Sequence, residues 1–143
     1  MDEKKTKILF VDDDEVLRIY FRDIFWIHGL ENKYEFETVD SLEKANEIIK
    51  NPKTRPNILF LDLLMPQVIN GRLILSPEGS FNLLKKIKTD PELKNIKVII
   101  FSGYSEKIFI DEAKKLGAEN YLIKGDNLPK EIIEFVEKIS KKK

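Results

Sequence analysis

Apolar residues follow two patterns that alternate along the chain. Four short runs are apolar throughout, which is typical of strands covered on both faces of a sheet; they span residues 8–11, 58–61, 98–101 and 121–123. A fifth segment, residues 34–39, alternates apolar and polar positions and is expected to be an edge strand.

Between these segments, apolar residues recur at the three- and four-residue spacing of an amphipathic helix. Asp40 or Ser41 can cap the second helix, and Gly29 and Gly117 follow the first and the fourth. Pro129 suits the first turn of the last helix. Strands that alternate with helices predict an α/β fold, in which helices cover both faces of a parallel sheet. The five predicted helices span residues 17–25, 42–49, 81–87, 108–116 and 132–139.

The amino-acid composition excludes or disfavours several classes of function. The chain has 143 residues with 25 basic and 25 acidic side chains, so no net charge attracts nucleic acid or an acidic membrane. The absence of cysteine excludes disulfides, zinc–thiolate sites and thiol nucleophiles, and a single histidine disfavours a catalytic triad. No apolar run approaches the length of a membrane span, and the first residues are too polar for a signal peptide. We therefore expect a cytoplasmic single-domain protein with neither direct nucleic-acid binding nor membrane insertion.

Polar side chains follow four of the predicted strands. Asp12 and Asp13 follow the first strand, and Asp62 follows the third. Ser102 follows the fourth strand and Lys124 follows the fifth. In an open parallel α/β sheet, ligands bind beyond the carboxyl ends of the strands. One aspartate after a strand is commonly a cap or a turn residue, but four strand ends of complementary chemistry predict a single binding site.

The residue types indicate what this site binds. Two or three carboxylates suit Mg²⁺, which keeps several of its water ligands. A lysine and a hydroxyl beside the cation suit the oxygens of a phosphoryl group. A carboxylate between them can act as the nucleophile that accepts this group. The pattern therefore predicts aspartyl-phosphate chemistry.

Four segments match, in order and spacing, the signatures of a known family: residues 8–14, 61–66, 98–103 and 121–124. They resemble those of the receiver domain of two-component response regulators, and the resemblance covers nearly the whole chain. It implies a flavodoxin-like, doubly wound sheet of five parallel strands in the order 2-1-3-4-5, with five helices. It also implies a single receiver domain over residues 1–143, with its core at about 6–140. Because the last helix extends almost to Lys143, we expect a stand-alone receiver similar to the chemotaxis response regulators.

The resemblance implies roles for the clustered residues. Asp62 would accept the phosphoryl group, and Lys124 would pair with it. Asp12, Asp13 and Asp62 would bind Mg²⁺ directly or through water, together with the backbone carbonyl of Leu64.

The resemblance also implies a switch and partners. Ser102 would bond the phosphoryl group in the active state, and the ring of Tyr121 would turn inward when Ser102 moves. The donor would be a phosphohistidine on a sensor histidine kinase or a histidine phosphotransfer protein, and the output would be binding of an unknown downstream protein. The chain would be a monomer or a weak homodimer, and it would catalyse only its own phosphorylation and dephosphorylation.

Two features depart from the family pattern. Gly125 follows Lys124 where the family has proline, so glycine would supply the unusual backbone by another route. An insertion at about residues 67–80 lengthens the connection after Pro66, and its Asn70-Gly71 pair predicts a hairpin turn. A harmless surface insertion and a docking element or flap beside Asp62 are both open interpretations.

The lifetime of the phosphorylated state depends on access of water to the phosphorus. Leu64 and Tyr104, each two residues beyond a site residue, flank this approach in the family fold. Neither side chain can orient a water as an acid or amide would, and both are bulky. We therefore expect slow self-dephosphorylation, over minutes or longer by order of magnitude.

Two alternatives compete with the receiver hypothesis. A small phosphatase similar to the haloacid dehalogenase superfamily would use Asp12 and Asp14 as its nucleophile and acid, with Ser102 and Lys124 in support. That hypothesis leaves the Asp62-x-x-Met-Pro motif unexplained. The other alternative is a degenerate receiver that binds partners without being phosphorylated, which the complete set of acidic, hydroxyl and lysine residues disfavours.

Overall fold

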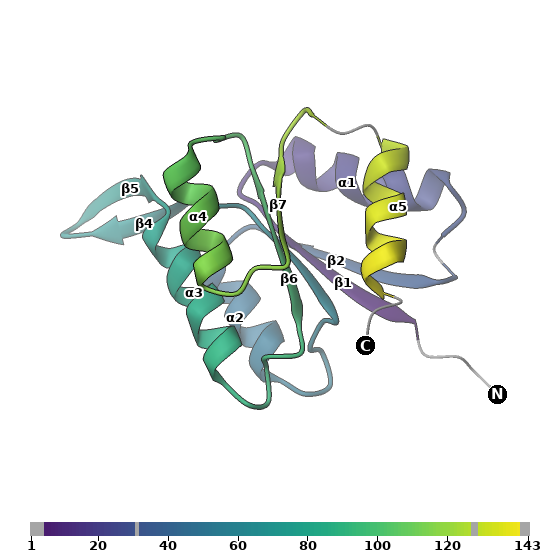
Figure 1. Cartoon of the computed structure of the whole chain (residues 1–143), viewed down its shortest axis with the longest axis horizontal. Helices are drawn as coiled ribbons and strands as arrows, with labels where there is room; N and C mark the ends of the chain where they lie inside the picture. Colours follow the sequence, from purple (N-terminus) through teal and green to yellow (C-terminus); the bar gives the residue numbers. More distant parts are fainter. Residues whose placement is uncertain (1–4, 31, 127–128, 141–143) are drawn as a thin grey trace.

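The computed structural model describes residues 5–30, 32–126 and 129–140. Its centre is a five-stranded sheet in the order β2-β1-β3-β6-β7, and each neighbouring pair of strands is parallel. Because β4 and β5 lie outside this sheet, the order corresponds to the expected 2-1-3-4-5, which is confirmed (Figure 1). The strands are β1 (Thr6–Val11), β2 (Tyr34–Val39), β3 (Ile58–Leu61), β6 (Lys97–Ser102) and β7 (Asn120–Ile123).

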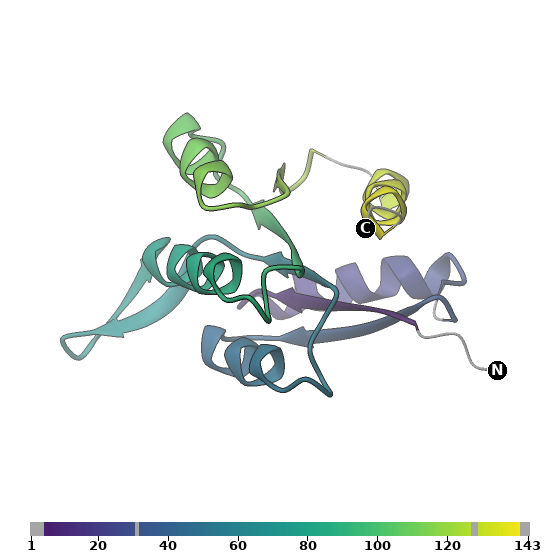
Figure 2. The ribbon, with the colours of Figure 1, turned by 60° about the horizontal axis from the view of Figure 1, so that its bottom comes forward.

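Helices cover both faces of the sheet, as the alternation predicts. α1 and α5 share one face, and α2, α3 and α4 share the other (Figure 2). Asp14 caps α1 by accepting hydrogen bonds from the backbone of Val16 and Leu17, and Ser41 caps α2. The helices are α1 (Glu15–Ile27), α2 (Leu42–Lys50), α3 (Glu78–Thr89), α4 (Lys107–Lys115) and α5 (Pro129–Ser140).

The central strands are buried on both faces, which explains their unbroken apolar runs. Successive residues alternate between two cores: Leu9 packs toward α2, α3 and α4, and Phe10 packs toward α1 and α5. The second core is rich in aromatic rings, and the rings of Phe10 and Phe21 stack with their centroids 4.3 Å apart. This two-sided packing holds the strand ends, and therefore the residues that follow them, in fixed positions.

A separate two-stranded hairpin follows β3. β4 (Met65–Ile69) pairs antiparallel with β5 (Arg72–Ser76), and the pair projects beyond α3 (Figures 1 and 2). Asn70 and Gly71 form the turn with φ angles of 52° and 78°, as a type I′ turn requires. The Asn-Gly hairpin prediction is therefore confirmed. The structure assigns residues 78–80 to the first turn of α3, so the extra segment ends sooner than the expected residue 80.

None of the helices in residues 5–30, 32–126 and 129–140 has the length and hydrophobicity that a membrane span requires.

Candidate functional site

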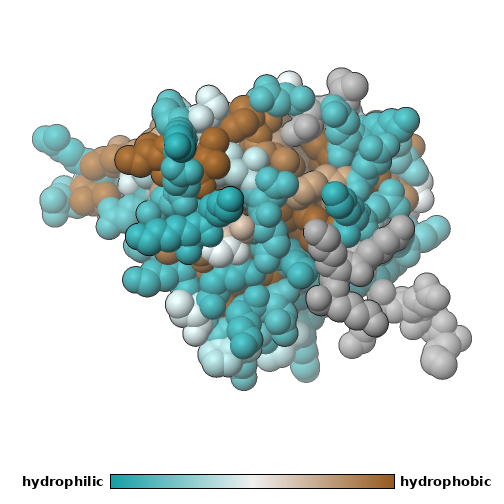
Figure 3. Space-filling view, in the orientation of Figure 1, coloured by the Kyte–Doolittle hydropathy of each residue, from teal (hydrophilic) through white to brown (hydrophobic). Residues whose placement is uncertain are grey.

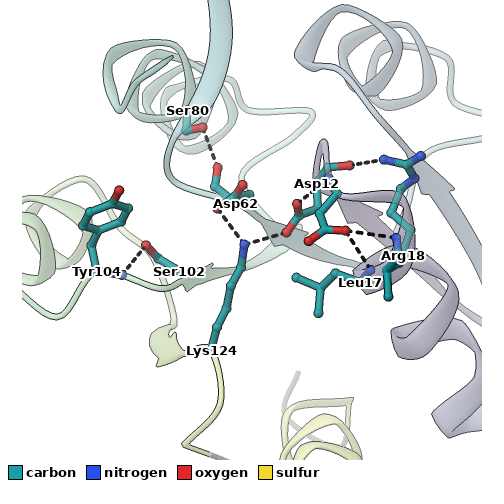
Figure 4. A network of polar contacts seen from close by, with 10 residues as sticks. Asp12, Leu17, Arg18, Asp62, Ser80, Ser102, Tyr104 and Lys124 are labelled. Atoms are coloured by element: carbon teal, nitrogen blue, oxygen red, sulfur yellow. Dashed lines mark hydrogen bonds and ion pairs between the residues drawn. The ribbon is translucent and has the colours of Figure 1, made fainter. Parts of the chain in front are cut away.

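The structure brings the four predicted strand ends together at one edge of the sheet (Figure 4). Asp12 directly follows β1, and Asp62 directly follows β3. Ser102 is the last residue of β6, and Lys124 directly follows β7. Because β1, β3, β6 and β7 are adjacent parallel strands, their carboxyl ends lie in one row.

Lys124 joins the two buried carboxylates. Its Nζ lies 2.8 Å from Oδ2 of Asp12 and 3.2 Å from Oδ1 of Asp62. Asp12 is 1% exposed and Asp62 is 7% exposed, so both carboxylates are largely removed from water. Charges this buried need a partner, and the ammonium group provides one for both.

Three carboxylates are close enough to share one cation. Oxygens of Asp12, Asp13 and Asp62 all lie within 4.8 Å of one another, and Asp13 is exposed while the other two are buried. A set of oxygen donors alone fits a hard divalent cation such as Mg²⁺. Leu64 is half-buried and lies two residues after Asp62, in the loop that leads to β4.

Electrostatics at the site disfavour negative charge. Burial, and next the charge of Asp12, raise the pKa of Asp62 to about 7, although Lys124 opposes this shift. Burial also raises the pKa of Asp12, against hydrogen bonds from Lys124 and the backbone of Asp14. For Lys124, burial alone would lower the pKa, but the hydrogen bond with Asp12 and the charge of Asp62 outweigh it and raise the pKa. The ammonium group of Lys124 therefore stays charged, and a second cation would further stabilise the two buried carboxylates.

Two polar residues that sequence reasoning missed hold the aspartates in place. The buried hydroxyl of Ser80 donates a hydrogen bond of 2.7 Å to the backbone carbonyl of Asp62. Nη1 of Arg18 donates one of 2.6 Å to the backbone carbonyl of Asp12. A serine beside a glycine at the start of α3 is a weak signal of a buried contact, and nothing in the sequence marks Arg18.

The proposed switch residues, Ser102 at the end of β6 and Tyr121 on β7, both bond to the backbone of Tyr104. The backbone N–H of Tyr104 donates to the hydroxyl of Ser102 over 3.1 Å, and its carbonyl accepts a 2.6 Å hydrogen bond from the hydroxyl of Tyr121. Burial raises the pKa of Tyr121, and a hydrogen bond with the Ser102 side chain opposes this. The backbone of Tyr104 therefore links Ser102 to Tyr121, and Figure 4 shows the Ser102 end of this link.

The two residues expected to limit water access differ in their surroundings. Leu64 is half-buried and packs against the core on the α2–α4 face. Tyr104 is 45% exposed, and its ring contacts Phe109 edge-on with the centroids 6.4 Å apart.

Gly125 supplies the backbone geometry after Lys124. Its φ is +88°, in the region that favours glycine, and the Lys124–Gly125 bond is trans. Asp14, which the phosphatase alternative requires as an acid at the site, instead caps α1 with its carboxylate. The geometry thus gives no support to that alternative.

Comparisons with known proteins agree with this arrangement. The family model of the response regulator receiver domain matches residues 8–137. Sporulation initiation phosphotransferase F of Bacillus subtilis is 30% identical over 118 residues, which are 82% of this chain and 81% of that protein. Chemotaxis protein CheY of Thermotoga maritima is 28% identical over 137 residues, which are 94% of this chain and 98% of that protein.

Solved structures share the fold at lower identity. A CheY-like receiver domain protein from Methanospirillum hungatei superposes with a TM-score of 0.75 and 22% identity, over 95% of this chain and 94% of that one. This likeness concerns the fold alone. The family match extends from β1 to α5 and includes all four strand ends. The chain therefore belongs to the response regulator receiver domain family, whose members are phosphorylation-controlled signalling modules of two-component systems.

Proposed function

We propose that Asp62 accepts the phosphoryl group and that Asp12, Asp13, Ser102 and Lys124 support this reaction. One observation carries the proposal: Asp62 lies at the end of the central strand β3, with its carboxylate 3.2 Å from the ammonium of Lys124 and within 4.8 Å of two further carboxylates. A nucleophile, a cation for the incoming anion and a set of metal ligands thus converge on one position.

The chemistry requires an ionised nucleophile. An oxygen of Asp62 forms a bond to phosphorus, and the bond from phosphorus to the donor breaks. With acetyl phosphate the leaving group is acetate. With a phosphohistidine it is the imidazole nitrogen, which keeps the electron pair and takes up a proton. Burial raises the pKa of Asp62 to about 7 even with Lys124 beside it, so a further cation at the site would favour the carboxylate at neutral pH.

We propose Mg²⁺ as the cofactor. Carboxylate oxygens of Asp12, Asp13 and Asp62 would hold it, together with the carbonyl of Leu64. When bound, the ion would neutralise the acidic cluster and the oxygens of the phosphoryl group.

The signal would leave the site through Ser102. A phosphoryl group on Asp62 offers acceptor oxygens for the O–H of Ser102. Turning the Ser102 side chain toward them would move its oxygen away from the backbone N–H of Tyr104, from which it now accepts. Loss of that bond would free the loop whose carbonyl holds Tyr121. The ring of Tyr121 would then rearrange, and this change would alter binding of a downstream protein.

The proposed donor is a phosphohistidine on a sensor histidine kinase or a histidine phosphotransfer protein. The relative from Bacillus subtilis is named a phosphotransferase, and this name supports a role of the present chain in phosphoryl transfer. The lack of cysteine suits a reducing compartment, and we place the protein in the cytoplasm.

Intact-mass spectrometry after incubation with acetyl phosphate and Mg²⁺ tests the proposal. The unmodified chain should gain one phosphoryl group, and Asp62→Asn should gain none. Asp111→Asn is the matched control, because this exposed aspartate on α4 lies outside the site and should leave the adduct unchanged. An adduct on Asp62→Asn would refute the assignment, and no adduct on the unmodified chain would favour the degenerate receiver.

A further inference from the structure

The register of the hairpin separates its side chains into two faces. Directly opposed residues of an antiparallel pair project to the same side. Pro66 opposes Leu75 and Val68 opposes Leu73, so these four residues form one face, which we call the outer face. All four are apolar.

The opposite face of the hairpin is anchored to the domain. Met65 is fully buried on that side. Gln67 lies so close to Gly79 of α3 that a Cβ at Gly79 would overlap its amide, and the same Cβ would clash with Leu42 of α2. The type I′ turn fixes the other end of the hairpin. The hairpin is therefore an ordered element whose outer face has a defined direction.

The outer face is exposed. Val68 and Leu73 are each 73% exposed and Leu75 is 60% exposed. Together they present roughly 400 Å² of apolar surface, comparable to the largest patch on a typical monomer. Apolar atoms are visible over the projecting hairpin in Figure 3. Arg72 is the single charged residue of the hairpin, and its side chain belongs to the opposite face.

We propose that the outer face binds the outer face of a second copy of this chain. Two copies related by a two-fold axis would place Val68, Leu73 and Leu75 against the same residues of the partner, so that both patches leave water together. No charge lies on the outer face to select a different partner, and the net charge of zero means that two copies do not repel.

The size of the patch predicts a weak association. Two such faces would bury roughly 800 Å² of apolar surface, which with a polar rim reaches the lower end of specific interfaces. We therefore expect reversible dimers with a dissociation constant on the order of 10 µM or weaker. The association needs no phosphoryl group, so it stands or falls independently of the proposed function.

Sedimentation equilibrium of the full chain, from about 1 to about 300 µM, tests the proposal. The unmodified chain should show concentration-dependent dimers. Leu73→Lys and Leu73→Glu should each weaken association at least about tenfold, because a two-fold axis doubles every introduced charge. An equimolar mixture of the two variants at low salt should recover association, because opposite charges then face each other.

Ile27→Lys is the matched control. Ile27 is 72% exposed on α1, so the same charge is added at equal exposure away from the hairpin, and dimerisation should not change. Val68→Lys repeats the test on the opposite strand. Circular dichroism and cooperative unfolding check that each variant folds. The proposal would be overturned if the unmodified chain stayed monomeric at the highest concentration. It would also be overturned if the Leu73 variants dimerised as strongly as the unmodified chain. An equal loss of association in Ile27→Lys would overturn it as well.

Discussion

The hairpin begins three residues after Asp62, yet the two regions depart in opposite ways from the usual burial of apolar groups and exposure of charged groups. At Asp62, charged groups are buried; on the outer face of the hairpin, apolar groups are exposed. Each arrangement is unfavourable for an isolated folded chain. Each would become favourable with the partner that we propose for it: a divalent cation at the site, or a second apolar face at the hairpin.

The two regions differ in how they connect to the rest of the fold. The site lies on four strands of the central sheet, and its supporting hydrogen bonds come from Arg18 of α1 and Ser80 of α3. The hairpin is a separate two-stranded sheet anchored on one side. A perturbation of the site should therefore affect the whole domain, whereas a perturbation of the hairpin should remain local.

Removal of divalent metal should have the largest effect. We expect excess EDTA to slow phosphorylation by acetyl phosphate roughly a thousandfold, because the three carboxylates then repel an anionic donor. The measurement is the rate of phosphoryl incorporation by intact mass, with Mg²⁺ added back as the control. Equal rates with and without metal would mean that Lys124 alone neutralises the site.

The pH dependence of stability should show the cost of burying Asp62. Its pKa of about 7 in the folded chain exceeds the usual 3.8, mainly because of burial and then the charge of Asp12. Between these values the folded state binds more protons than the unfolded state, so the free energy of unfolding falls as pH rises through this window. Above about pH 7 the full penalty is present, on the order of 2 kcal/mol after allowance for relaxation.

Asp62→Asn removes this penalty. In metal-free buffer the variant should gain more stability over the unmodified chain at about pH 8 than at about pH 5. Chemical denaturation at both pH values measures the difference. Asp111→Asn, at an exposed position, should show no such pH-dependent gain. A gain from Asp62→Asn that is larger at low pH would show that the folded carboxyl has a lowered pKa.

The sequence predicted the fold and the convergence of the four polar strand ends, for physical reasons. Strands buried on both faces are apolar throughout, and this pattern with its short length predicted the strand at residues 58–61. The placement of Asp12, Asp62, Ser102 and Lys124 in one row follows from parallel strands with a shared edge. The type I′ turn at residues 70–71 was also predictable, because asparagine and glycine tolerate positive φ.

Other features depend on contacts between distant segments and left no local signal. Ser80 bonds the carbonyl of Asp62, eighteen residues away, and serine at the start of a helix normally suggests a cap. The position of the hairpin depends on the contact of Gln67 with Gly79. The apolar run at residues 73–75 could equally have been a buried strand, and only the structure shows that two of its residues belong to an exposed face.

Dephosphorylation should respond to Leu64 and Tyr104, the residues expected to limit access of water to the phosphorus. We predict that Leu64→Asn combined with Tyr104→Glu speeds the loss of the phosphoryl group about ten- to a hundredfold. The introduced amide and carboxylate can orient a water opposite Asp62, which the native side chains cannot. The decay of the phosphorylated form by intact mass measures the effect. Ile108→Asn, at a 72% exposed apolar position on α4, is the control. Decay of the unmodified protein within seconds, or an unchanged rate in the double variant, would contradict the prediction.

A change in the hairpin turn should have the smallest effect and shows whether the two regions are independent. Gly71→Ala places a side chain at φ 78°, which costs about 1 kcal/mol even though a Cβ there meets no atom within 4 Å. Gly29→Ala is the control, because it also has open space and a positive φ of 68° but follows α1, so the protection of β5 should not change. Hydrogen exchange should show faster opening of β5 amides in Gly71→Ala, with unchanged protection in β1 and β3. Since the hairpin is joined to the domain on one face only, the free energy of global unfolding should fall by less than the local loss. An equal loss of protection in the central sheet would show that the hairpin and the site unfold as one unit.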